Sequence, residues 1–155
     1  MSVKIDNATI NNSAANSATS VRTAQNTAAE ASGATKTFQS VFKGARLEEF
    51  NGTMNELLDI VRSRGQDFLN SPQEGSLNDY KESVKYFLGR LKEEFLSLKD
   101  EFGAKRDGEQ KVYQLVDTAG DQAEALSREA FTKDDALNLL SSLDEIRGLV
   151  LDVIG

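Results

Sequence analysis

The sequence contains no cysteine and no histidine. Without cysteine the chain cannot form disulfides, zinc–thiolate sites or a thiolate nucleophile. Without histidine it lacks the commonest general base and the commonest transition-metal ligand, and it cannot build the Glu-x-x-His di-iron site of helical bundles. It also lacks a phosphate-binding glycine loop and a nucleophile-elbow motif. These absences predict a protein that is not an enzyme and binds no metal or cofactor.

Long apolar runs and an excess of positive charge are missing as well. No uncharged apolar run reaches the roughly 18 residues of a membrane span, and no secretory signal pattern opens the chain. The net charge of −7 disfavours binding to nucleic acid or to an anionic membrane. We therefore expect a soluble, cytoplasmic, bacterial-type protein whose partner is another protein or a second copy of itself in a homo-oligomer.

Residues 1–36 are rich in Asn, Ser, Thr and Ala and contain no aromatic residue. Such a segment buries too little apolar surface to offset the entropy lost on ordering, so we predict a disordered, low-complexity tail. One alternative is a marginal alanine-rich helix over residues 21–31. Another is functional, because flagellar and type III export substrates also carry Ser- and Asn-rich N-termini.

The most regular stretch of the chain is residues 77–102. Its large apolar residues recur at helical spacing, and they are Leu77, Tyr80, Val84, Phe87, Leu88, Leu91, Phe95, Leu98 and Phe102. This pattern predicts a helix of about seven turns with one apolar face, which other helices must cover. Ser76 is the expected N-cap, although the helix can also begin near Pro72. Glu94 alone is charged on the apolar face, so we expect it to pair with an arginine or to lie at the end of the bundle.

Three further helices are predicted around this one. The first spans about 38–64, with a possible break at Gly44 and a stop at Gly65. The second begins near Glu109 and has a small-residue face that extends to Ala130. The third follows a capping box formed by Thr132 and the residue three positions later. The predicted fold is therefore an all-α, antiparallel four-helix bundle over residues 37–155, preceded by the disordered tail.

Arg147 falls within the apolar arc of the last helix. A buried guanidinium is costly unless it is paired, so we predict a partner, with Asp144 preferred and Asp117 as the alternative. Asp144, Gly148 and Asp152 form a narrow polar strip along the same helix. We interpret Gly148 as permitting close helix contact and Arg147 as fixing register. The functional alternative is a recognition site for a carboxylate or a partner loop.

Tyr80, Lys81 and Lys85 form a second cluster, in which Tyr80 brings its hydroxyl to the edge of the core. The two lysines lie one turn apart. Their simplest interpretation is an amphipathic flank with snorkelling lysines. The alternative is a site for a small anion.

Three motifs occur in the order typical of one bacterial family. They are Tyr80-Lys81-x-x-Val84-Lys85-x-Phe87-Leu88, Tyr113-x-Leu115-Val116 and Asp144-x-Ile146-Arg147-Gly148-Leu149-x-x-Asp152. Over roughly residues 45–155 the chain resembles the YaaR-like family. The resemblance implies a compact all-helical bundle of the bacterial cytoplasm and implies no activity, because the family is uncharacterised.

These observations favour a non-catalytic helical-bundle adaptor that binds a protein partner. The first alternative is an export-linked protein, either substrate or chaperone, in which residues 1–36 carry the signal. The second alternative is a sensor of a small anion near Lys81, Lys85 or Arg147.

Overall fold

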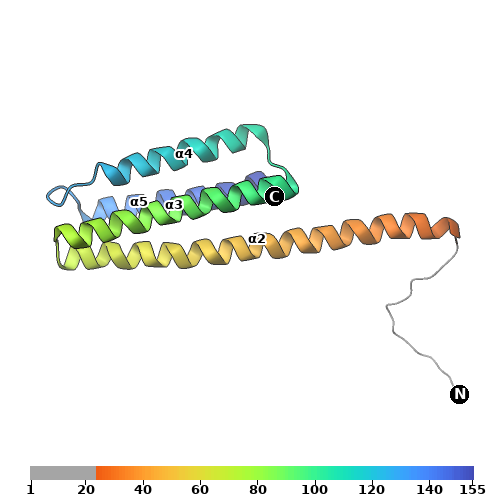
Figure 1. Cartoon of the computed structure of the whole chain (residues 1–155), viewed down its shortest axis with the longest axis horizontal. Coiled ribbons are helices and arrows are strands. Elements are labelled where there is room, and N and C mark those ends of the chain that lie inside the picture. The colour runs from red at the N-terminus through yellow and green to blue at the C-terminus, as the bar shows by residue number, and fades with distance from the viewer. Residues whose placement is uncertain (1–23) are drawn as a thin grey trace, which may run out of the picture. The chain divides into compact units, whose positions relative to one another are not determined.

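The computed structural model describes the backbone of residues 24–155 and the side chains of residues 37–155. Within this part the chain is helical and contains no strand (Figure 1). Its helices are α2 (Ala24–Asn70), α3 (Glu74–Phe102), α4 (Arg106–Glu124) and α5 (Lys133–Ile154). The chain divides into two units, Met1–Lys43 and Gly44–Gly155, and the division falls inside α2. The predicted all-α fold is confirmed.

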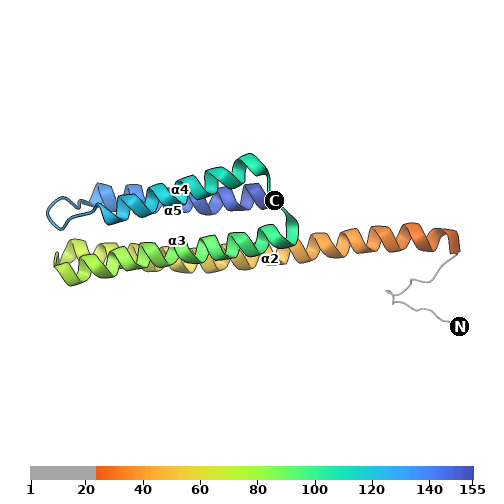
Figure 2. The same ribbon diagram turned by 45° about the horizontal axis from the view of Figure 1, so that its top comes forward.

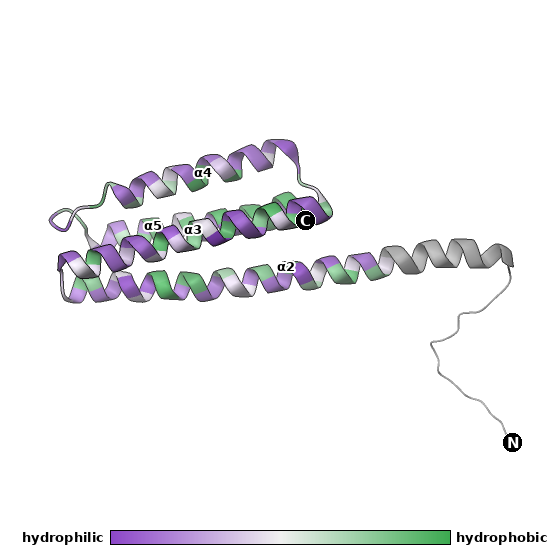
Figure 3. Ribbon diagram, viewed as in Figure 1, coloured by the Kyte–Doolittle hydropathy of each residue, from purple (hydrophilic) through white to green (hydrophobic). Residues whose placement is uncertain are grey.

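The unit Gly44–Gly155 is the helical bundle. Consecutive helices run in opposite directions, as Figures 1 and 2 show, and α4 packs against both α3 and α5. Hydrophobic and hydrophilic residues are interleaved along each helix (Figure 3), as expected of amphipathic helices that share one core. The fully buried side chains of that core include four large aromatic residues, Phe50, Phe68, Phe87 and Phe95. The predicted antiparallel four-helix bundle is confirmed.

The apolar face predicted for α3 is buried from end to end, and only Phe102 remains partly exposed. The helix begins earlier than Ser76, because Ser76 lies in its first turn and accepts a hydrogen bond from the Gln73 backbone N–H at 3.1 Å. The alternative start near Pro72 was therefore correct. The helix ends at Phe102, and the next residue, Gly103, has a φ of +80°, a conformation that residues with a Cβ rarely adopt.

The predicted stops within α2 are wrong. The helix continues through Gly44 without a break and through Gly65 to Asn70. At Gly65 an added Cβ would lie 3.2 Å from Tyr80 Cε1, so this glycine allows α2 to approach α3. Phe68, in the following turn, is buried and its ring centre lies 5.2 Å from that of Phe131. Burial of a phenylalanine outweighs the helix-propensity cost of about 1 kcal/mol for one glycine.

The predicted boundary between tail and bundle, at residue 36, lies within α2. Residues 1–23 of the predicted tail are outside the described residues. The backbone of residues 24–36 is helical, and it overlaps the alanine-rich helix that was the alternative for residues 21–31.

The connection between α4 and α5 corrects the predicted end of α4 and confirms the predicted start of α5. Helix α4 ends at Glu124, so Ala130 does not belong to its apolar face and is exposed. Phe131 lies in the connection and is buried. The predicted capping box at the start of α5 is present, since Thr132 N donates to Asp135 Oδ2 at 2.9 Å and Asp135 N donates to Thr132 Oγ1 at 3.1 Å.

Candidate functional site

Arg147 joins α5 to α2. Its Nε and Nη2 atoms donate to Asp144 Oδ1 at 3.0 and 2.8 Å, and its Nη1 atom donates to Asn51 Oδ1 on α2. The Arg147 side chain is 20% exposed. The preferred partner, Asp144, is therefore confirmed, whereas Asn51 was not foreseen. An arginine held by a carboxylate on its own helix and an amide on the facing helix fixes the register of the two helices.

The other members of the polar strip have different surroundings. Asp117, the alternative partner, lines a groove with residues of α3 and α4 such as Lys85. Asp152 is exposed, and its backbone carbonyl accepts a hydrogen bond from Lys105 Nζ at 3.3 Å. A Cβ added at Gly148 would meet no atom within 4 Å. The interpretation of Gly148 as a helix-contact residue is therefore wrong.

A close contact of the predicted kind occurs at Gly108 instead. A Cβ placed there would run into the side chain of Val153, so the absence of a side chain lets the first turn of α4 approach the last turn of α5. The glycine that permits close helix contact therefore lies on α4, near the end of the bundle, and not on α5.

Lys81 and Lys85 both bind the end of α4. Lys81 Nζ donates to the backbone carbonyl of Glu124 at 3.1 Å, and Lys85 Nζ lies 2.5 Å from Glu124 Oε1. The hydrogen bond and the charge of Lys85 lower the pKa of Glu124. Cations at a helix C-terminus also interact favourably with the helix dipole. The two lysines therefore tie α3 to α4, and an anion bound there would have to compete with Glu124.

Tyr80 lies deeper than predicted. Only 1% of it is exposed, and its ring centre is 5.0 Å from that of Phe131. Its hydroxyl has no hydrogen-bond partner among the described residues. Burial, with a smaller contribution from the charge of Asp135, raises the pKa of the hydroxyl, which keeps it a donor in the neutral range. The prediction that this hydroxyl lies at the edge of the core is therefore wrong.

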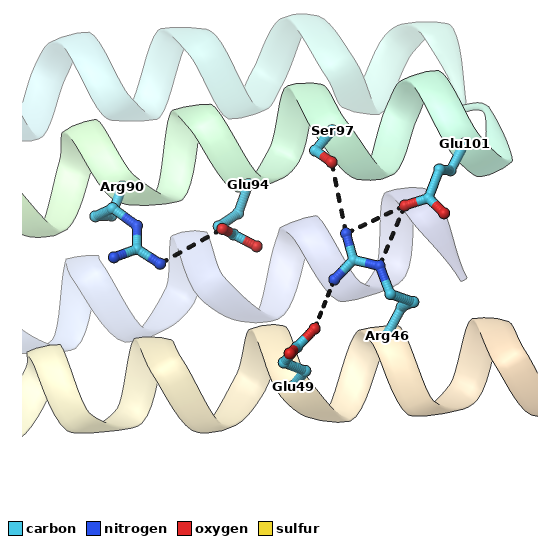
Figure 4. Close-up of polar contacts among 6 residues, drawn as sticks. All are labelled: Arg46, Glu49, Arg90, Glu94, Ser97 and Glu101. Carbon is cyan, nitrogen blue, oxygen red and sulfur yellow. Dashed lines mark hydrogen bonds and ion pairs between the residues drawn. The ribbon is translucent and has the colours of Figure 1, made fainter.

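Sequence reasoning missed a polar network between α2 and α3 (Figure 4). Arg46 donates to Glu101 Oε1 at 3.1 Å and to Glu49 Oε1 at 2.8 Å. On the same side of α3, Arg90 Nη2 lies 3.4 Å from Glu94 Oε2, which confirms the predicted arginine partner of Glu94. The spacing of Arg46 and Glu49 could have indicated their pair. The contact to Glu101 depends on how α2 and α3 are aligned, which no local pattern gives.

Two apolar side chains of α2 are largely exposed. Phe38 is 70% exposed and Val41 is 67% exposed, and they lie three residues apart on one side of the helix. Within the described residues of the unit Gly44–Gly155, the apolar side chains of α2 that pack against the bundle core begin at Leu47. The spacing of Phe38 and Val41 continues the apolar pattern of α2 into the unit Met1–Lys43.

Within residues that the structure describes, no three or more acidic side chains come together in a way that would hold a metal ion. None of the described helices combines the length and apolar character needed to cross a bilayer.

Comparison with known proteins places the chain in a family. No curated protein and no solved structure matches the chain. A family model matches residues 9–154, which extends the resemblance that we recognised over roughly 45–155 toward the N-terminus. The chain therefore belongs to the family described as "Protein of unknown function (DUF327)", which is also known as YaaR-like.

Proposed function

We propose that this protein is a non-catalytic adaptor of the bacterial cytoplasm and that it binds a protein partner through the α2 segment 37–43. The observation that carries the proposal is the exposure of Phe38 and Val41 on one side of a helix. Large apolar side chains at a spacing of three or four residues are the anchors by which a helix enters an apolar groove. Burial of each anchor contributes about 1.5–3 kcal/mol.

Charge indicates the chemistry of the partner. Residues 31–45 contain Lys36 and Lys43 and no acidic residue, in a chain whose net charge is −7. A positively charged segment within an acidic protein is complementary to an acidic surface. We therefore expect the partner to offer an apolar groove flanked by Asp and Glu side chains.

The test is affinity purification from the native cell with the full-length protein as bait. A stoichiometric partner recovered by the wild type is purified, and its dissociation constant is measured by titration. Phe38→Asp should weaken binding by at least about 30-fold, because loss of a central apolar anchor costs 2 kcal/mol or more. Raising the salt concentration should weaken the wild-type complex as well.

Leu96→Asp is the matched control. Leu96 is an exposed apolar residue of α3, so this variant makes the same kind of change elsewhere and should bind like the wild type. If Phe38→Asp and Leu96→Asp bind equally well, the proposed surface is wrong. If the wild type recovers no stoichiometric partner, the adaptor role is wrong.

The export-linked alternative rests on residues 1–36, most of which lie outside the described residues. It stays a prediction. Deletion of residues 2–36 tests it, because an export substrate would lose secretion, whereas an adaptor would be found in the cytoplasm with or without this segment.

A further inference from the structure

The bundle unit carries an open groove between α2 and α3, with a volume of about 710 Å³. Two large apolar side chains line it from opposite walls. Ile60 on α2 is 46% exposed, and Tyr86 on α3 is 56% exposed. Exposed aliphatic and aromatic side chains that share one groove are typical of surfaces that become buried in a protein–protein interface.

The two walls of the groove also carry different charges. Helix α2 contributes Arg64, and α3 contributes Asp79 and Glu82. Arg64 lies 3.8 Å from Asp67, but both side chains are at least half exposed, and pairs of this kind are weak. The two carboxylates form no ion pair among the described residues. Lys85, the remaining charged residue of the lining, is already bound to the end of α4.

Two contacts fix how α2 and α3 are aligned. Gly65 lies against Tyr80, and Arg46 donates to Glu101 at 3.1 Å nearer the other end of α3. The two helices are antiparallel (Figure 2), so a step back along α2 and a step forward along α3 cover the same distance, about 1.5 Å per residue. The level of every residue of the groove therefore follows from these two contacts.

This alignment places Ile60 about level with Tyr86, and Arg64 about level with Glu82. A two-fold axis parallel to the helices would turn a second copy so that α2 of each copy faces α3 of the other at the same level. Ile60 of one copy would then pack against Tyr86 of the other, and Arg64 would pair with Glu82. A two-fold axis across the helices would set α2 against α2 and lose both pairings.

We propose that the groove between α2 and α3 is the interface of a symmetric homodimer. The occupant is a second copy because the groove is complementary to itself: the cation of one wall lies level with a carboxylate of the other, and the two apolar side chains are also level. A different protein would require no such relation between the two walls. The interface belongs to the unit Gly44–Gly155 and does not depend on the α2 segment 37–43 or on the adaptor function.

Sedimentation equilibrium of the full-length protein over a wide range of concentrations tests the proposal. We expect a reversible monomer–dimer equilibrium with no larger species, because a two-fold interface is closed. Tyr86→Asp should weaken the dimer at least about 30-fold, since it removes a central apolar anchor from both copies. Leu137→Asp is the matched control, because Leu137 is a similarly exposed residue of α5 outside the groove, and it should dimerise like the wild type. Circular dichroism checks that both variants fold.

Charge reversal tests the arrangement of the two copies. Arg64→Glu and Glu82→Arg should each weaken the homodimer at least about tenfold, because like charges would then face each other on both sides of the two-fold axis. An equal mixture of the two variants should dimerise again. In the mixed dimer one side has the native pair of charges and the other side has the same pair reversed.

Four results would overturn the proposal. The first is a wild type that stays monomeric at every concentration. The second is a dimer that Tyr86→Asp leaves unchanged, which would place the interface elsewhere. The third is a mixture of the charge variants that does not dimerise, which would mean that Arg64 and Glu82 do not face each other. The fourth is a monomeric wild type that recovers another protein which Tyr86→Asp fails to bind, since the groove would then belong to that protein.

Discussion

Replacement of single glycines by alanine should change stability in opposite directions at different helix positions. Gly89 in α3 and Gly148 in α5 lie inside helices, and a Cβ at either position would meet no atom within 4 Å. Alanine is favoured over glycine in a helix interior by about 1 kcal/mol. Gly89→Ala and Gly148→Ala should therefore each stabilise the protein by about 0.5–1 kcal/mol.

Gly108→Ala should have the opposite effect. The added methyl group would run into the side chain of Val153. Overpacking of this kind typically costs about 1–3 kcal/mol, and the propensity gain is small because Gly108 lies in the first turn of α4. We expect a net loss of about 1–2 kcal/mol.

Urea denaturation followed by circular dichroism measures all three changes. A change of 1 kcal/mol should shift the melting temperature of a chain of this size by about 2–4 °C. Destabilisation by Gly148→Ala would refute the placement of this residue in open space. Tolerance of Gly108→Ala would refute the close contact between the start of α4 and the end of α5.

Leu91→Ala should cost about 2–5 kcal/mol in urea denaturation, because Leu91 is fully buried, whereas Leu96→Ala on the exposed side of the same helix should change stability by less than ~0.5 kcal/mol. Arg147→Ala should cost about 1–2 kcal/mol, because it leaves the amide of Asn51 and the carboxylate of Asp144 without their shared donor, and full stability of this variant would refute a structural role. The pKa of Glu124 is lowered by Lys85. A carboxyl group of this kind stabilises the fold above its unfolded pKa and loses that contribution as the pH falls through its folded pKa. Glu124→Gln should therefore lower the urea midpoint at neutral pH, and this effect should disappear as the pH falls below the folded pKa of Glu124; an effect that persists in acid would contradict the pairing.

The apolar pattern predicted the fold well because the bundle is built from local periodicity. Each apolar position from Leu77 to Leu98 is buried. A helix with a single apolar face can bury that face only by turning it toward the other helices. Glycines were harder to interpret. Gly65 looked like a helix stop but lies inside α2 against a neighbouring helix, and Gly148 looked like a helix contact but lies in open space within α5. Whether a glycine ends a helix or admits a neighbour depends on what lies opposite, and for Gly65 that neighbour is Tyr80.

Partners of polar side chains were predicted correctly only within a helix. The Arg147–Asp144 pair is three residues apart and follows from helical spacing. The bond from Arg147 to Asn51 spans 96 residues of sequence. The bonds from Lys81 and Lys85 to Glu124 likewise depend on where α4 ends beside α3. Such contacts are set by the longitudinal alignment of neighbouring helices, which apolar periodicity does not determine.

The motifs that carried the family resemblance consist largely of residues that hold the bundle together. Val84 and Phe87 are fully buried, and the lysines of the same motif bind the end of α4. Arg147, the centre of the last motif, joins α5 to α2. Side chains that are committed to packing or to helix pairing are poor candidates for contact with a partner. The binding surface should therefore be sought among residues that the bundle does not use, and Phe38, an exposed aromatic residue outside all three motifs, is the first to test.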